Sequence, residues 1–474
     1  MRMRTSLLVL LYAVALGGMA QGRMSLDQCL RLAHERNLDL RNAMLDAELA
    51  SQARAQAYWS FLPNLNGAAT HGYNWGKTID RFTNTFASSR VRTNNFYLSS
   101  DVTLFESGIR HKQLKRSELD EQAAEKALDV ARNDISMAVV RAYLDLLGMQ
   151  EQVEAARGQT ASTRAQVGQM EALFEAGRVA RGDVLSLQAQ LAQEEYNEEN
   201  LRIQAEQAKL TLSQLMQLAP DEHARLEVEA PQVGAFAVAE PTATEEQVLA
   251  QVLARNPAYA QADLGVQSAG FGVGISRAGG LPSLSFNGSL GTGYSGRNLE
   301  AVGDPRPDGS ILIGATEGGM PVYAPSFAQD TRVKSFAQQL NDNLNESVGL
   351  TLSVPIFNNM RNRYAVSQAR IQHEQAKNML GKTRNNLQMD VQNALTAQRG
   401  AYRQYVGAQL SVDAAEEALR MADERFGRQA ITVTDLNAAK ARLQQSKAQL
   451  ISAKYSYLMA EKALDILQGI PINL

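Results

Sequence analysis

Two aspartates occupy equivalent places in a motif that occurs twice in the chain. Asp183 ends the segment FEAGRVARGD and Asp435 ends FGRQAITVTD, so each carboxylate follows a phenylalanine, Phe174 or Phe426, at the same distance. Each aspartate also begins a segment with helical apolar spacing, where a carboxylate can accept hydrogen bonds from free backbone N–H groups as an N-cap. The carboxylates could also line an opening, a role that capping does not exclude, and there clustered like charges raise one another's pKa and attract cations.

The other polar residues do not point to catalysis or to a bound metal. The run from Gly270 to Gly274 lacks the G-x-G-x-x-G spacing of a nucleotide loop, and small residues for close helix packing explain it better. The 15 methionines are dispersed, which is typical of core positions rather than of copper or silver ligands. The histidines are scattered and form no H-E-x-x-H motif: His34, His71, His111, His223 and His373. We therefore expect no enzymatic activity, no cofactor and no metal.

The composition is that of a folded and secreted protein. The chain has 474 residues, of which 45% are hydrophobic and 20% charged, enough for a large core. Arg2, Arg4, an apolar run and small residues up to Ala20 predict a signal peptide over 1–20. Its removal makes the formal net charge of −3 more negative, so no nucleic-acid partner is expected. Cys29 is the single cysteine, which excludes a disulfide framework, and we expect it to be a small core residue.

The chain consists of two copies of one pattern. The matches are Leu30, Asn37 and 62–65 with Leu249, Asn256 and 281–284 at an offset of 219 residues, and Phe174, Asp183 and Leu191 with Phe426, Asp435 and Leu443 at an offset of 252. The difference is one insertion of 33 residues within 295–345, where the sequence DPRPDG and several glycines indicate a long loop. The expected organisation is a first structural repeat over 21–217, an equatorial linker over 218–244, a second repeat over 245–468 and a C-terminal tail over 469–474.

Each repeat contains two strands that are expected to form a β-hairpin. Alternating apolar and polar residues predict them, at Phe96, Leu98, Val102 and Leu104 and at Val348, Leu350, Leu352, Val354 and Ile356. In the first half the expected strands cover 61–75 and 95–105, with a loop at 76–94. Such a strand is half buried in a globular sheet, or faces lipid on one side in a membrane barrel, and the alternation alone does not choose.

A long helix follows each pair of strands. In the first half, apolar residues recur at spacings of four and three from Ile135 to Phe174, and only Thr160 and Thr163 interrupt this heptad seam. The seam recurs from Leu387 to Phe426. A helix over 107–174 would be roughly 100 Å long at about 1.5 Å per residue. Shorter helices are expected over 25–60 and 183–217.

No stretch after the leader approaches the roughly 20 apolar residues of a membrane helix, so an integral protein with this sequence would span as a β-barrel. Four strands per chain cannot close a barrel, because small barrels need about eight. Two, three or four chains would then be required. Aromatic residues near the hairpin ends suit an interfacial girdle, or else the core of an ordinary sheet: Tyr73, Trp75, Phe82, Phe86, Phe96, Tyr97 and Tyr294.

The helix turns and the repeated hairpins resemble the outer-membrane efflux protein (TolC) family over nearly the whole chain. The family's helix-turn signature is an aromatic residue, two residues, glycine, five residues and Asp-Val-Leu. The segment from Phe174 to Leu185 matches it in full, whereas the second copy keeps Phe426 and Asp435 but has Gln429 in place of glycine. The opening segment LDQCLRLAHERNLDL also resembles the family's first helix.

The resemblance implies a mixed α/β membrane protein of the cell outer membrane that extends into the periplasm. It would be a homotrimer with a 12-stranded transmembrane β-barrel, four strands per protomer, surrounded by outer membrane lipid, and with a long α-helical coiled-coil barrel. Its implied partners are a periplasmic adaptor (membrane fusion) protein and an inner-membrane pump of the RND or ABC type. The implied function is passive exit of small molecules or exported polypeptide from a tripartite efflux pump or type I secretion system.

The resemblance also assigns roles to the two turns. It implies a periplasmic gate or constriction at Asp183, Asp435, Phe174, Phe426 and Ile431, where three chains would place up to six carboxylates around one opening. It implies adaptor contact at Gly177, Arg178, Val179 and Gln429, although Gly177 can equally be an ordinary helix-terminating glycine. The second turn has Ile431, Ala438 and Phe426 where the family commonly has arginine, aspartate and tyrosine. Closure is therefore expected to depend more on packing.

Two other classes of protein remain as alternatives. A non-channel periplasmic coiled-coil adaptor or scaffold protein would share the heptads but should lack repeated hairpins. An envelope hydrolase would need a nucleophile or metal site that the sequence does not show. Drug, metal and protein export share this outlet architecture, so the sequence does not rank the substrates.

Overall fold

The computed structural model describes residues 23–80, 82–87, 90–229, 238–428 and 430–470. The expected signal peptide, the central part of the expected equatorial linker and the end of the expected C-terminal tail therefore lie outside the described residues. The chain forms two compact units, and each unit takes residues from both halves of the sequence. Unit 1 comprises Met1–Gln52, Glu118–Ser268 and Glu374–Leu474, and unit 2 comprises Ala53–Ser117 and Ala269–His373.

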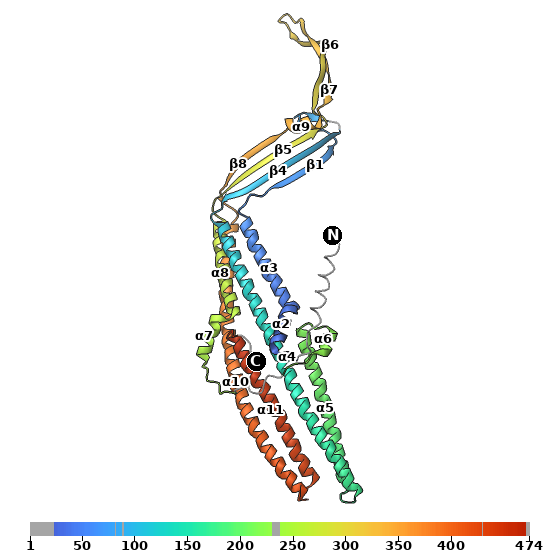
Figure 1. Ribbon diagram of the computed structural model, residues 1–474. Helices are drawn as coiled ribbons and strands as arrows, with labels where there is room; N and C mark the ends of the chain where they lie inside the picture. Colours follow the sequence, from blue (N-terminus) through green and yellow to red (C-terminus); the bar gives the residue numbers. More distant parts are fainter. Residues whose placement is uncertain (1–22, 81, 88–89, 230–237, 429, 471–474) are drawn as a thin grey trace, which may run out of the picture. The chain divides into compact units, whose positions relative to one another are not determined.

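Helices make up most of the described chain (Figure 1). They are α2 (Leu26–Arg36), α3 (Leu38–Trp59), α4 (Ile109–Glu175), α5 (Arg181–Leu215), α6 (Pro220–Arg225), α7 (Glu245–Arg255), α8 (Pro257–Ala278), α9 (Phe336–Asp342), α10 (Arg361–Gly427) and α11 (Val433–Leu467). Helices α4 and α10 have 67 residues each, and α5 and α11 have 35 each, so the two halves match in length as the repeat predicts. None of the described helices is long and apolar enough to cross a membrane.

Most residues of the heptad seams are buried or half-buried as the sequence predicts, whereas Phe174 at the end of the first seam is exposed. In unit 1, Val139 is fully buried, Leu146 and the two seam threonines, Thr160 and Thr163, are each 1% exposed, and Val391 of the second seam is also fully buried. Thr160 donates its hydroxyl to the Ala156 carbonyl oxygen at 3.0 Å, which satisfies the polar atom inside the seam. Cys29 is 0% exposed, which confirms it as a core residue.

The first helix of each repeat is broken by an asparagine, a feature that the expected helix over 25–60 missed. Asn37 separates α2 from α3, and its Oδ1 accepts hydrogen bonds from the backbone N–H groups of Asp39 and Leu40 at 2.9 and 3.2 Å. Asn256 separates α7 from α8 in the same way and accepts from the Ala258 N–H at 2.9 Å. An asparagine cap competes with the continuing helix, which explains the break.

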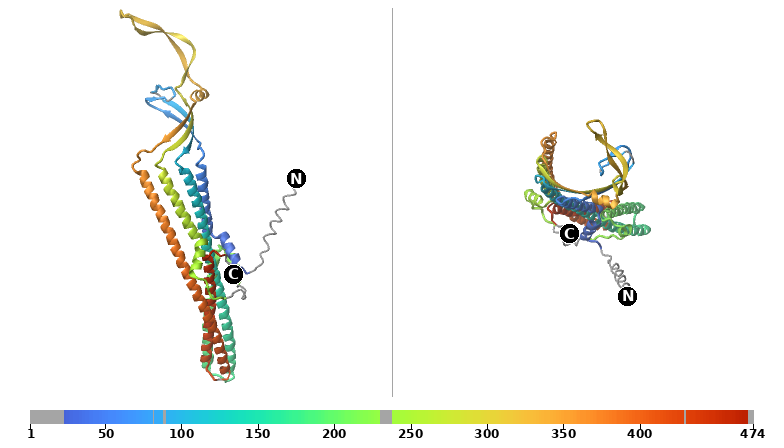
Figure 2. Two further views of the ribbon diagram at one scale, coloured as in Figure 1. Left: turned by 90° about the vertical axis from the view of Figure 1, so that its left-hand side faces the viewer. Right: turned by 90° about the horizontal axis from the view of Figure 1, so that it is seen from above.

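Unit 2 contains a four-stranded antiparallel sheet in the order β1-β4-β5-β8 (Figure 1 and Figure 2). Its strands are β1 (Asn66–Asn74), β4 (Val91–Phe105), β5 (Ser283–Ser295) and β8 (Asn345–Ser353). The central β4–β5 pairing joins the hairpin of the first half to that of the second. Strand β8 stops before the predicted Val354 and Ile356, because Pro355 has no N–H to donate to the ladder.

The 33-residue insertion forms a hairpin rather than the expected long loop. Strands β6 (Leu299–Ala315) and β7 (Pro321–Val333) pair over most of their length, and α9 follows them. Two of the irregularities in the register, between Val302 and Arg306 and between Pro307 and Ser310, lie beside Gly303 and Gly309, which both have positive φ. The prolines and glycines therefore produce bulges within a hairpin instead of ending the strands. A further pair of short strands, β2 (Thr78–Ile79) and β3 (Phe86–Ala87), lies in the expected first loop.

Candidate functional site

The first helix turn, between α4 and α5, is closed by Gly177. This residue has a φ of +67°. The Gly177 N–H donates to the Phe174 carbonyl at 2.8 Å and the Arg178 N–H to the Leu173 carbonyl at 2.9 Å, the crossed bonds of a glycine-terminated helix. A Cβ added at Gly177 would meet no described atom within 4 Å, so the backbone conformation rather than crowding requires glycine. The helix-terminating role is therefore established by the geometry, and adaptor contact stays a prediction.

The second turn, between α10 and α11, is closed by a capping box. Thr432 is the N-cap of α11, and its hydroxyl accepts from the Asp435 N–H at 3.2 Å. In return, Asp435 Oδ2 accepts from the Thr432 N–H at 3.0 Å and from the Thr432 hydroxyl at 2.7 Å. These hydrogen bonds lower the pKa of the Asp435 carboxyl, which is exposed in the protomer. Gln429 lies outside the described residues.

The N-cap prediction was wrong for both aspartates, because each helix begins earlier than the sequence suggested. Helix α5 begins at Arg181 with Ala180 as its N-cap, and Ala180 has no side-chain hydrogen bond to offer. Asp183 is the third helical residue, and its N–H donates to the Ala180 carbonyl at 3.1 Å. Asp435 holds the matching place in α11, but there the N-cap is Thr432. The two helix starts therefore differ at the N-cap, where α11 has the hydroxyl of Thr432 and α5 has the methyl group of Ala180.

A small apolar cluster packs beneath the turns and includes residues from both halves. Its buried members are Val167, Met170, Val184 and Leu187, against which Phe426 and Val433 of the second half pack. Phe174, the counterpart of Phe426, is 38% exposed instead. Arg178 is also exposed, whereas Val179 and Ile431 are half-buried. The structure thus brings Phe426 to the first turn and leaves Phe174 facing outward in the protomer.

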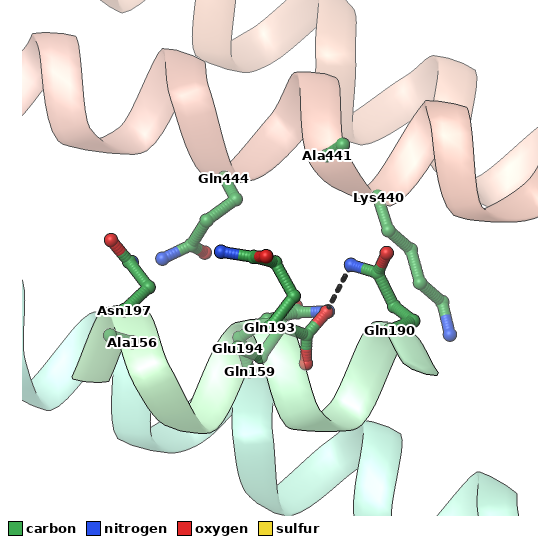
Figure 3. A pocket seen from close by; sticks show the side chains of 9 residues that line it. All are labelled: Ala156, Gln159, Gln190, Gln193, Glu194, Asn197, Lys440, Ala441 and Gln444. Atoms are coloured by element: carbon green, nitrogen blue, oxygen red, sulfur yellow. Dashed lines mark hydrogen bonds between the residues drawn. The ribbon is translucent and has the colours of Figure 1, made fainter. Parts of the chain in front are cut away.

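A polar cavity of about 240 Å³ lies among α4, α5 and α11, farther along the helices from the turns (Figure 3). Its lining is Ala156, Gln159, Gln190, Gln193, Glu194, Asn197, Lys440, Ala441 and Gln444. Glu194 Oε1 accepts from the amides of Gln159 and Gln190 at 3.2 and 2.8 Å. The second carboxylate oxygen of Glu194 is buried without a hydrogen-bond partner among the described residues. A second cavity of about 230 Å³ shares Asn197 and Gln444 with the first.

Lys440 lies at one end of the first cavity and is only 7% exposed. Its ammonium group donates to Gln166 Oε1 on α4. Burial lowers the pKa of Lys440, and the charges of Asp423 and Glu194 oppose this shift. The hydrogen bond from Lys440 to Gln166 links α11 of the second half to α4 of the first.

Lys440 is the first of three lysines spaced seven residues apart on α11, which we call the lysine ladder: Lys440, Lys447 and Lys454. Lys447 pairs with Glu416 on α10 at 2.9 Å, and Lys454 pairs with Glu151 on α4 at 2.9 Å. The lysines follow Val433 at intervals of seven residues, and Leu436 and Leu443 hold the other seam position between them. Lysines at a heptad seam position are the signal that could have revealed these contacts.

The chemistry of this region is that of a hydrogen-bonded seam between helices. The first cavity presents amides, one ammonium group and one carboxylate. Among the described residues, no cluster of three or more histidine, cysteine, aspartate or glutamate side chains could hold a metal ion. The arrangement can hold water or polar solutes and can fix the spacing of the helix pairs.

One known protein family matches both halves of the chain. A family model described as "Outer membrane efflux protein" matches residues 29–216 and 248–469, one match in each half of the chain. The chain belongs to this family. As an outer membrane efflux protein it is located in the cell outer membrane and extends into the periplasm, which confirms the predicted location. The family consists of channel proteins rather than enzymes.

Individual relatives agree with this assignment. The chain is 23% identical to the outer membrane protein TolC of Vibrio cholerae, over 96% of this chain and 93% of that protein. It is 26% identical to the alkaline protease secretion protein AprF of Pseudomonas aeruginosa, over 93% of this chain and 83% of the relative. The solved structure of the Campylobacter jejuni CmeC outer membrane channel superposes with a TM-score of 0.74 at 19% identity, covering 94% of this chain and 85% of CmeC. This structural likeness confirms the predicted fold class.

Proposed function

We propose that this outer membrane efflux protein is the exit duct of a tripartite efflux pump or type I secretion system. It acts as a homotrimer in which 12 strands form one barrel, and it conducts small molecules or exported polypeptide passively. An adaptor in the periplasm and a pump in the inner membrane deliver the cargo. Membership of the efflux family and the likeness to TolC and AprF support this proposal over a periplasmic adaptor or scaffold.

The observation that carries the proposal is the two-faced sheet of unit 2. In the register of β4, β5 and β8, Leu98 pairs with Leu290 and Phe286 pairs with Leu350, so these side chains lie on one face. Leu98 is 46% exposed and Leu350 is 65% exposed in the protomer. The opposite face is polar, and there Ser289 and Ser347 hydrogen-bond through their hydroxyls at 2.7 Å. An exposed apolar face opposite a polar one is suited to lipid outside and water inside.

The helix turns supply the proposed gate. Phe426 and Val433 pack against the first turn, so closure rests on this apolar contact and on the polar seam that includes the lysine ladder. Asp183 and Asp435, repeated in three protomers, supply a ring of carboxylates that favours cations. Gly177, Arg178 and Val179, and by position Gln429, supply the surface for the adaptor. The two repeats, the equatorial linker over 218–244 and the tail over 469–474 are proposed as the domain organisation.

The proposal is tested with the purified full-length protein. We expect native mass spectrometry in detergent to give a trimer, and planar bilayers to show single-channel currents. We also expect a strain without the gene to become sensitive to exported compounds, or to stop secreting a protein, until the gene is restored. A stable monomer found free in the periplasm would refute the channel. Co-purification with an adaptor and a pump would identify the partners.

A further inference from the structure

At one end of the sheet, β1 ends at Asn74 and β4 begins at Val91. We call this the distal end of the sheet. It carries cationic side chains that lie over aromatic rings. The Arg92 guanidinium carbon lies 4.6 Å from the centroid of the Tyr294 ring. The Arg90 guanidinium carbon lies 5.1 Å from that of Tyr73. Stacking on a ring holds a guanidinium flat and leaves its N–H edge open to another ligand.

These stacked pairs lie on the apolar face of the sheet. Arg92 pairs with Tyr73 across β1 and β4, and it is separated from Leu98 on the same strand by an even number of residues, without a register shift. Successive side chains alternate between the faces of a strand, so Arg92 and Tyr73 share the face of Leu98 and Leu290. Trp75, which is 72% exposed, lies beside Tyr73 with a ring separation of 6.1 Å. The face therefore changes from aliphatic to aromatic and cationic towards its distal end.

The charges around this end leave the two arginines without acidic partners. Arg90 and Arg92 form no ion pair with any residue that the structure describes, and both are exposed. Nearby acids are engaged elsewhere: Asp342 pairs with Lys334 at 2.8 Å, and the Asp80 carboxylate accepts the Ser295 hydroxyl. A further acid on this face, Glu346, lies on β8, two strands away from β4. The distal end thus presents net positive charge at the edge of an apolar surface.

We propose that Arg90 and Arg92 bind the phosphate groups of anionic lipids in the outer leaflet of the membrane. The planar guanidinium fork matches a phosphate, and the adjacent apolar face receives the acyl chains. Lys77, whose ammonium lies 5.4 Å from the Phe86 ring centroid, adds a third cation in the neighbouring loop. The inference rests on the proposed function, because it takes the apolar face to contact lipid and the distal end to lie in the outer leaflet.

The test measures lipid retained by the trimer. Wild-type protein in a neutral detergent is mixed with lipid A that carries both phosphates, and bound lipid is counted by native mass spectrometry. We expect Arg90→Gln with Arg92→Gln to weaken lipid A binding at least about tenfold, since hydrogen bonds to charged groups are the stronger class. Arg90→Lys with Arg92→Lys should bind with intermediate strength. The matched control is Arg384→Gln with Arg403→Gln, which removes the same charge from exposed positions of α10 and should leave binding unchanged.

Two further arms identify the ligand. Lipid A without its phosphates should bind the wild type as weakly as the double glutamine variant binds intact lipid A, and equal binding of both lipids by the wild type would overturn the proposal. Inorganic phosphate should not displace bound lipid A. Full displacement would show that the site binds free phosphate rather than a lipid, which would overturn the proposal. Single-channel currents are recorded on the same preparations. Trimers that conduct but bind lipid A equally well with and without its phosphates refute this inference alone. A protein that neither trimerises nor conducts refutes the proposed function.

Discussion

Lys454 of α11 lies 2.9 Å from Glu151 of α4, an ion pair between residues 303 positions apart in the sequence. The two side chains are 32% and 40% exposed, so water screens much of their attraction. Together with the bond from Lys440 to Gln166, this pair joins the second repeat to the first along one face of α11.

For the Lys454–Glu151 pair we expect a small coupling energy. A double-mutant cycle with Lys454→Met and Glu151→Gln should give about 0.2–1 kcal/mol in the free energy of unfolding, because the pair is partly exposed. Chemical unfolding in detergent measures it, and the coupling should shrink at high salt. A coupling that is unchanged by salt would show that packing rather than charge joins the two residues.

Lys440 should make stability depend on pH. Burial lowers the pKa of its ammonium below the ordinary value of 10.5. Between the lowered pKa and 10.5, the unfolded chain holds a proton that the folded chain has lost, so the free energy of unfolding rises with pH through this window. Lys440→Met should lose that rise. The measurement is the difference between wild-type and variant unfolding free energies across pH. Lys447→Met, at a less buried ladder position, serves as control, and parallel curves for wild type and Lys440→Met would contradict the prediction.

Asp435→Asn should lower the cation preference of the open channel. The substitution removes one carboxylate per protomer but keeps an oxygen that can accept the hydrogen bonds of Thr432, so the capping box is largely preserved. Reversal potentials in asymmetric salt measure the preference. Asp413→Asn, on α10 away from the turn, should leave it unchanged. Unaltered selectivity in Asp435→Asn would remove Asp435 from the pore.

Gly177→Gln should reduce efflux complementation while trimers still form. The φ of +67° strains any L side chain there by roughly 1–2 kcal/mol, and the new side chain projects into open space where the adaptor is expected. Gly168→Gln on α4, which also meets open space but has no positive φ, is the matched control. Complementation and trimer yield are scored together. Full complementation by Gly177→Gln would count against adaptor contact at this turn.

The thiol of Cys29 should not react with maleimide in the folded protein. Cys29 is fully buried, and burial raises the pKa of its thiol to about 12. We expect no maleimide labelling at pH 8 in native protein and one label per chain after unfolding, since the thiolate is the reactive species. Ser162→Cys adds an exposed thiol on α4 and should label without unfolding. Rapid native labelling of Cys29 would show that the core around α2 opens.

Sequence periodicity predicted the large elements because they repeat. The heptad seam from Ile135 to Phe174 and its copy predicted two long helices, and alternation around Phe96 and Leu350 predicted strands of the sheet. These patterns extend over many residues, so a local irregularity does not hide them.

The features that the sequence patterns do not predict depend on single side chains or on their surroundings. Asn37 breaks a helix whose apolar pattern continues through it. Thr432 rather than Asp435 caps α11, although the T-x-x-D spacing was visible in the sequence. Lys440 donates a hydrogen bond to Gln166, which lies in the other half of the chain, so this contact cannot be inferred from the neighbours of Lys440 in the sequence. The β6–β7 hairpin contains prolines and glycines that are typical of loops.

The difference between the two turns has a consequence for the gate that the turns would form in an assembled trimer. Thr432 and Asp435 lock the start of α11, whereas α5 starts at an alanine that offers no side-chain bond. In the proposed trimer the six turns would alternate around the axis between helix starts with a side-chain cap and helix starts without one. A docking partner would then meet two kinds of turn in alternation, one closed by the Gly177 backbone bonds at the end of α4 and one closed by the Thr432–Asp435 bonds at the start of α11.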